Sequence, residues 1–249
     1  MKSSSFQVIF TSVAALYTLW LLLTFRLEGM SRTLLRPKAI GRNLFYTLVV
    51  NLIVGIVFAG WLLRSHIHHE IIAGQAAGFS ALQQTILSVA IGFILGLMLH
   101  LIHSPPSRKF IILLNGFLKA APLSVAEVLI CWALIGSYAE AMGSRIGLPL
   151  PTLFAGLIAA LLFGVYHIAH SPPYNSLRMM KQLSVLGLFT SAFFFLTRDV
   201  YGTIVFHNFI GMHLILWASH QHDLLDHYQA IRWSQLASAV VSIGLLVVV

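Results

Sequence analysis

The sequence is poor in charged residues, and above all in acidic ones. Only 9% of its 249 residues are charged, and Asp and Glu together number 7, whereas 58% of the residues are hydrophobic. An ordinary soluble domain has about 25% charged residues. A water-soluble globular fold is therefore excluded, and an integral membrane protein is expected.

Cysteine and linker-like segments are also scarce. Cys131 is the single cysteine and lies in an apolar run, which excludes a disulfide framework. No low-complexity stretch and no shift in composition marks a boundary between domains. We therefore predict one integral membrane domain over residues 1–249.

Long apolar runs are what the sequence has instead. A membrane-spanning helix needs about 20 mostly apolar residues, and runs of about this length, separated by polar breaks, predict an all-α, polytopic transmembrane helical bundle of about eight spans. The first run has no small-residue cleavage site, so it is expected to be an uncleaved span. The predicted spans are Phe6–Phe25, Leu44–Leu63, Leu82–His103, Phe110–Tyr138 with a break at Pro122, Thr152–His170, Leu183–Thr197, Tyr201–Ala218 and Ser234–Val249.

The net charge of +8 is explained by the membrane and does not require nucleic acid. Basic residues gather in alternate loops: after span one (Arg26 to Arg42), after span three (Arg108 and Lys109) and after span five (Arg178 and Lys181). Such asymmetry is typical of cytoplasmic loops. We predict a multi-pass protein of the cell membrane with the lipid bilayer and no nucleic acid as partner.

A seven-residue pattern occurs twice. His100 to Pro106 reads HLIHSPP and ends span three, and His167 to Pro173 reads HIAHSPP and ends span five. A Pro-Pro pair cannot continue a helix, so each copy ends its span just after two histidines. The repeat indicates a reused helix stop, and it is too short to establish a duplication.

Ionisable residues inside spans are costly, so they are the first candidates for function. Glu127 is the one acid predicted to lie within a span. The six other carboxylates are predicted to lie in loops or at span ends: Glu28, Glu70, Glu140, Asp199, Asp223 and Asp226.

Six histidines lie in or at the ends of the spans, and each can transfer a proton near neutral pH or bind a metal. They are His100, His103, His167, His170, His207 and His213. We expect His103 and His170 to lie among lipid headgroups and His167 and His207 to lie deeper. A carboxylate and two histidines from three helices then predict a shared site formed by Glu127, His167 and His207.

These residues resemble the CPBP (ABI) family, the CAAX-prenyl-endopeptidase and bacteriocin-processing type of glutamate intramembrane proteases. Family members carry EExxxR in one helix, FxxxH at the end of a later helix, and HxxxN or HxxxD beyond that. Phe163 to His167 (FGVYH) fits the second motif, and His207 fits the third in part. The resemblance covers roughly Ala121 to Leu214, within a family-like core at about residues 110–218.

The first and third motifs depart from the family pattern. If Glu127 is aligned with the first glutamate, Val128 takes the place of the second and Trp132 that of the arginine, while Ala133 keeps the usual small residue. Sliding the alignment by one residue would lose that small residue. In the third motif Gly211 stands where Asn or Asp is expected, and Asn208 could supply an amide from another direction.

The resemblance implies an intramembrane endopeptidase that cuts a membrane-anchored protein or peptide, without a metal or another cofactor. By the same resemblance Glu127 and His167 activate water, and His207 with Asn208 stabilises the oxyanion.

Two other functions remain open at this stage. The histidines could make this a His-rich membrane protein that binds a metal or haem. Alternatively, a non-catalytic family member could act as a scaffold or transporter with Glu127 as a proton or cation site.

Overall fold

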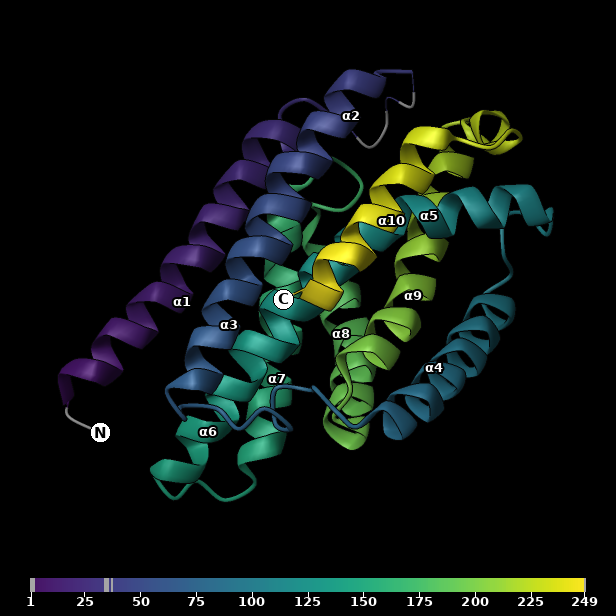
Figure 1. Cartoon of the computed structure of the whole chain (residues 1–249). Helices are drawn as coiled ribbons and strands as arrows, with labels where there is room; N and C mark the ends of the chain where they lie inside the picture. The colour runs from purple at the N-terminus through teal and green to yellow at the C-terminus, as the bar shows by residue number, and fades with distance from the viewer. Residues whose placement is uncertain (1–2, 34–35, 37, 249) are drawn as a thin grey trace.

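The described part of the chain, residues 3–33, 36 and 38–248 of a computed structural model, is helical and contains no strand. This confirms the predicted all-α bundle (Figure 1). The turns of η1, η3 and η4 are wider than those of an α-helix, and the turns of η5 and η6 are narrower. In chain order the elements are α1 (Ser3–Thr24), η1 (Phe25–Gly29), α2 (Ile40–Tyr46), η3 (Thr47–Phe58), α3 (Ala59–His68), α4 (Leu82–Ile102), α5 (Phe110–Glu127), η4 (Val128–Gly136), α6 (Ser137–Arg145), α7 (Pro151–Tyr166), η5 (His167–Ala169), α8 (Leu177–Thr197), α9 (Val200–Gln221), η6 (Leu225–Tyr228) and α10 (Trp233–Val248).

Seven helices among the described residues are long and apolar enough to cross a membrane, so the chain is a multi-pass membrane protein. They are Ile9–Gly29, Ile40–His68, Leu82–Ile102, Phe110–Arg145, Pro151–Ala169, Leu177–Thr197 and Val200–Gln221. The last predicted span, Ser234–Val249, is not among these seven helices. It forms α10, which has 16 residues, fewer than the roughly 20 that a full crossing needs, and Val249 lies outside the described residues.

The predicted break at Pro122 is wrong. Helical structure continues through this buried proline from Phe110 to Arg145. In a membrane protein a proline inside a helix is tolerated when neighbouring helices satisfy the freed backbone groups. Figure 1 shows α5 lying across the direction of its neighbours. Its last residue, Glu127, is buried, and helical structure continues from there into η4.

Small residues allow α4 and α9 to pack closely. The buried face of α4 carries Ser88, Gly92, Gly96 and His100, one residue every fourth position. A Cβ atom at Gly92 would collide with the carbonyl oxygen of Gly202 in α9. Hydrophobic burial does not drive helix association in lipid, whereas close van der Waals packing does. The small residues on α4 allow this close packing.

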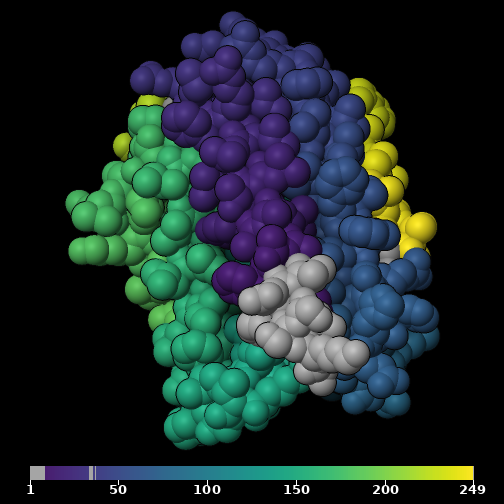
Figure 2. Space-filling view, turned by 90° about the vertical axis from the view of Figure 1, so that its left-hand side faces the viewer, coloured from purple at the N-terminus to yellow at the C-terminus, as the bar shows by residue number. Residues whose placement is uncertain are grey.

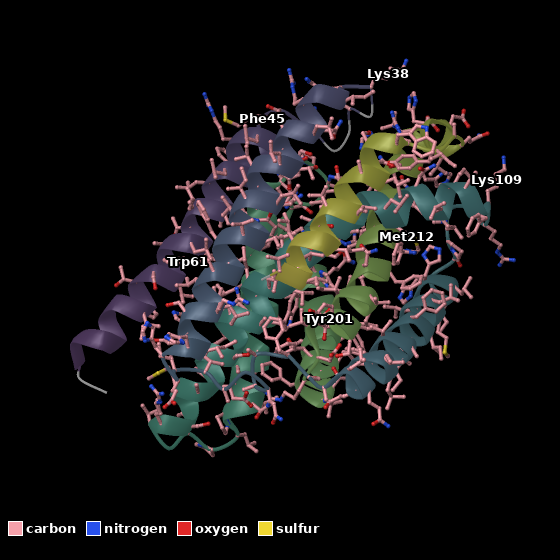
Figure 3. The ribbon with its side chains drawn as sticks, viewed as in Figure 1. Lys38, Phe45, Trp61, Lys109, Tyr201 and Met212 are labelled. Carbon is pink, nitrogen blue, oxygen red and sulfur yellow. The ribbon has the colours of Figure 1, made fainter. Side chains whose placement is uncertain are left out.

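The two ends of the bundle differ in charge. Lys38 and Lys109, in two of the basic loops, lie at the end opposite Tyr201 (Figure 3). Near the Tyr201 end, Arg198 donates hydrogen bonds from Nη1 and Nη2 to the two carboxylate oxygens of Glu140, each at 2.5 Å. Arg198 therefore pairs with an acid from α6 and not with its neighbour Asp199, which caps α9 by accepting from the Gly202 N–H at 2.6 Å.

The first helix, α1, lies along one face of the bundle. In Figure 2 it runs between the blue segment that contains η3 and α3 and the green segments that include α7. The Tyr17 hydroxyl donates to the Leu162 carbonyl at 2.7 Å, and the Trp20 ring stacks on Tyr166 with centroids 3.5 Å apart. The end of α1 is thereby held against the end of α7, where the predicted site lies.

Candidate functional site

Glu127 lies at the end of α5 and is only 2% exposed, in surroundings that are apolar almost throughout. Its Oε2 lies 3.0 Å from Nε2 of His207 in α9. Its Oε1 lies 3.8 Å from Nε2 of His167 in η5 and has no hydrogen-bond partner in the part of the chain that the structure describes. Three helical segments thus bring together the three residues that the sequence analysis selected.

The ring of His207 is held from both sides. Its Nδ1 lies 2.9 Å from the Thr190 hydroxyl of α8, and its Nε2 faces Glu127. An ionised carboxylate only accepts hydrogen bonds, so with Glu127 ionised the Nε2 of His207 donates and the Thr190 hydroxyl donates to Nδ1 of the neutral ring. This arrangement leaves a polarised N–H pointing at the carboxylate.

The ring of His167 has the opposite tautomer. Its Nδ1 lies 2.8 Å from the carbonyl oxygen of Phe163, one turn earlier. A carbonyl oxygen only accepts, so Nδ1 carries the hydrogen and Nε2 of the neutral ring presents a lone pair. Nε2 of His167 and Oε1 of Glu127 are then two acceptors 3.8 Å apart, which is the geometry that a bridging water molecule satisfies.

A small cavity adjoins these groups. It has a volume of about 30 Å³ and is lined by residues that include Glu127, Phe163, His167, His170, Tyr174 and His207. One water molecule needs roughly 10–15 Å³ measured in this way. The cavity therefore has room for the water that the two acceptors would hold.

Aromatic rings fix the positions of the two histidines. The Phe163 ring lies edge-on to His167 at 4.8 Å and to His207 at 5.0 Å between centroids. Trp132 lies 5.1 Å from the His207 ring, and its Nε1 donates to the Ser191 hydroxyl at 2.8 Å. Phe163 and Trp132 thus both contact the site.

Asn208 is not at the cavity, contrary to the expectation of an oxyanion donor. Its Oδ1 accepts from the Ser124 hydroxyl at 3.0 Å, and its Nδ2 donates to the Phe117 carbonyl at 3.1 Å. Consecutive residues on an α-helix point about 100° apart, so when His207 faces the cavity its neighbour faces α5. The amide of Asn208 holds α9 against α5.

The structure places another buried carboxylate, Glu28, close to the site, although the sequence analysis placed it in a loop or at a span end. Glu28 in η1 is fully buried. It accepts from both the backbone N–H and the hydroxyl of Ser171, each at 2.6 Å. A side chain at Gly29 would collide with the carbonyl oxygen of Ala169, so η1 approaches η5 very closely.

His170 links this second carboxylate to the site. The expected position among headgroups is wrong, because His170 is 2% exposed. Its Nδ1 lies 3.4 Å from Oε2 of Glu28, and its ring stacks on His167 with centroids 5.0 Å apart. The only signal in the sequence was a single acid among the arginines after span one.

Tyr174 closes the cavity beside His170. Burial raises the pKa of its phenol above the ordinary value, so the hydroxyl stays protonated and donates to the Leu214 carbonyl at 3.0 Å. This bond joins the loop after η5 to α9.

The remaining histidines lie apart from Glu127. His100 and His213 face each other with their Nδ1 atoms 3.1 Å apart, and His103 lies at the exposed end of α4 with its ring 6.0 Å from His213. Among residues 3–33, 36 and 38–248, no group of three or more His, Cys, Asp or Glu side chains is arranged to hold a metal ion. The six histidines selected from the sequence are therefore divided between two places.

Comparisons with known proteins identify no relative. The geometry around Glu127 is thus the basis for assigning a function. The chain matches no family model, no curated protein and no solved structure.

Proposed function

We propose that this chain is an intramembrane endopeptidase of the cell membrane that hydrolyses a peptide bond in a membrane-anchored protein or peptide, and that it is a divergent member of the CPBP group. The observation that carries the proposal is the position of Glu127 between His167 and His207, 3.8 Å and 3.0 Å away, beside a cavity large enough for water. A buried carboxylate is costly in a membrane protein and marks a functional site by default.

In the proposed reaction, a water molecule held by Glu127 and His167 attacks the carbonyl carbon of the substrate. Oε1 of Glu127 takes a proton from the water as the C–O bond forms. Protonation weakens Glu127 as an acceptor, so the Nε2–H of His207, which donates to its Oε2 in the resting site, becomes available to the substrate oxygen and stabilises the negative charge that develops there. Glu127 then gives the proton to the leaving amide nitrogen as the C–N bond breaks.

The apolar surroundings suit this chemistry. A fixed donor acts more strongly on the oxyanion where the dielectric constant is low. The clamped rings of His167 and His207 keep the reacting groups in place without further reorganisation.

The test is cleavage of membrane-anchored reporter peptides by the purified full chain in lipid vesicles, with products identified by mass spectrometry. Glu127→Gln and His167→Ala each abolish the products if the proposal holds. Glu70→Gln and His68→Ala are matched controls, because both side chains are exposed and lie outside the cavity. Products that persist in Glu127→Gln would contradict the proposed function.

A further inference from the structure

A second, much larger cavity opens on the side of the bundle. It lies between α4, α8 and α9 and has a volume of about 810 Å³, within the range of about 300–1,000 Å³ that is typical of sites for small molecules. Most of its wall is apolar, with Val185, Leu186 and Phe189 on α8 and Phe209, Ile210 and Leu214 on α9.

The lining changes from polar to apolar along α8. Arg178 and Lys181 lie at the start of the helix, and Val185 and Phe189 follow along the cavity. With a rise of about 1.5 Å per residue, Arg178 and Phe189 are separated by roughly 16 Å along the helix. This is about half of the roughly 30 Å hydrocarbon thickness of a bilayer, so the cavity matches the depth of one leaflet.

The two cations at the start of α8 have no acid to neutralise them. The first turn of α8 contains no acidic residue, and neither Arg178 nor Lys181 forms an ion pair within the described part of the chain. A cation near the amino end of a helix is unfavourable, because that end of the helix dipole is itself positive. An anion bound there offsets the repulsion between the two cations and the repulsion between the cations and the helix dipole.

Two histidines, His100 buried and His213 half-buried, provide further hydrogen-bonding groups at the same end. His100 and His213 line the cavity with Nδ1 atoms 3.1 Å apart. His100 is 2% exposed, and its Nε2 has no hydrogen-bond partner among the described residues. A half-buried tryptophan, Trp217, also lines the cavity near this end, as is usual at the boundary between headgroups and hydrocarbon.

We propose that this cavity binds one anionic phospholipid, with its phosphate near Arg178 and Lys181 and an acyl chain along Val185, Leu186 and Phe189. The positive charge complements the headgroup, and the apolar wall has the length of a single leaflet. The predicted orientation places Arg178 and Lys181 on the cytoplasmic side, where membranes expose anionic lipids. This inference is independent of the proposed peptidase function.

The lipid lies beside the Glu127 cavity. Ile210 and Leu214 line both cavities, so one layer of side chains separates the acyl chain from the candidate site. A bound lipid therefore supports the position of α9, which carries His207.

The experiment measures quenching of Trp217 fluorescence by lipids with brominated acyl chains in vesicles that contain the full chain. The Trp217 signal is the difference between the unchanged protein and Trp217→Phe. Brominated phosphatidylglycerol quenches this signal at a mole fraction about tenfold lower than brominated phosphatidylcholine, because charge-assisted contacts to the phosphate favour it.

Two variants and one control separate specific binding from general attraction. Arg178→Gln with Lys181→Gln removes the preference for phosphatidylglycerol, whereas Arg108→Gln with Lys109→Gln, an equal loss of exposed charge in another basic loop, retains it. Val185→Phe fills the apolar part without adding a tryptophan, and it weakens quenching by both lipids while the charges remain. Each variant is used only if its circular dichroism and thermal unfolding match those of the unchanged protein.

Equal quenching by the two lipids overturns the proposal. Equal loss of preference in the two paired charge variants also overturns it, because attraction would then be general to the basic end. Displacement of phosphatidylcholine by a lipidated peptide but not by phosphatidylglycerol would assign the cavity to a substrate tail instead.

Discussion

Oε2 of Glu127 lies 3.0 Å from Nε2 of His207, although 80 residues separate them in the sequence. The carboxylate and the imidazole come from helices whose crossing is fixed by the neighbouring amide of Asn208, which bonds to two residues of α5. The geometry of the site is therefore set by the packing of α9 on α5.

Removal of the hydroxyl behind His207 is expected to weaken the site without destroying it. In Thr190→Val the Nδ1 of His207 loses its partner at 2.9 Å, so the peptidase rate falls about tenfold. His207→Ala removes the donor itself and lowers the rate about 10²–10³-fold. Thr197→Val, farther along α8, leaves the rate unchanged. The measurement is the initial rate of cleavage of one reporter peptide by each variant. Equal rates in Thr190→Val and Thr197→Val would contradict the role of the Thr190 hydroxyl in holding His207.

Glu28 is expected to stabilise the fold and to hold His170 beside His167. Glu28→Ala removes the acceptor for both donors of Ser171, at 2.6 Å each, and leaves buried polar groups unpaired. We expect a loss of about 3–5 kcal/mol in the free energy of unfolding, measured by denaturant titration in detergent micelles. Glu70→Ala, at an exposed position, changes it by less than about 0.5 kcal/mol. A similar small change in Glu28→Ala would show that the burial of this acid is unimportant.

Gly92 and Gly244 are expected to respond to alanine in opposite directions. A Cβ at Gly92 collides with the backbone of Gly202, so Gly92→Ala forces α4 away from α9 and costs about 1–3 kcal/mol. Gly244 in α10 has nothing within 4 Å of an added Cβ, and alanine there favours the helix by about 0.5–1 kcal/mol. Thermal unfolding of the two variants compares them directly. If alanine stabilised the protein at both positions, the close contact between α4 and α9 would be contradicted.

Trp132 is expected to act through His207. Trp132→Phe keeps an aromatic ring but removes the N–H that donates to Ser191 at 2.8 Å, which costs about 1 kcal/mol of stability and loosens the wall beside His207. The peptidase rate falls more than substrate affinity does, because Trp132 is not among the residues that line the cavity at Glu127. Trp61→Phe, at a side chain that is 70% exposed, is the control. A lower affinity with an unchanged rate would place Trp132 in substrate binding instead.

The sequence alone predicted the class of fold, most of the spans and the grouping of Glu127, His167 and His207. Apolar runs are a strong signal because a bilayer imposes a minimum length, and an isolated glutamate in such a run is conspicuous. Pro122 was misinterpreted, because whether a proline ends a helix depends on the helices packed around it. Asn208 was misplaced because adjacency in the sequence does not determine which way a helix is turned.

The contribution of Glu28 could not be predicted from local sequence. Its immediate neighbours are Leu27 and Gly29, Arg26 and Arg32 lie close by, and this local pattern does not indicate a buried acid. Its hydrogen-bonding partner, Ser171, lies 143 residues away, so only the packing of α1 against the end of α7 reveals the contact. The larger cavity was missed for a similar reason, since three separate helices supply its walls.

The bond between Glu28 and Ser171 has a consequence for biosynthesis. Ribosomes add about 5–20 residues per second, so roughly 7–30 s pass between synthesis of Glu28 and synthesis of Ser171, which is 143 residues later. During that interval the carboxylate must remain in contact with water or lipid headgroups at the membrane surface. His207 is synthesised later still. The candidate site is therefore completed only after α9 has been made and has reached the membrane.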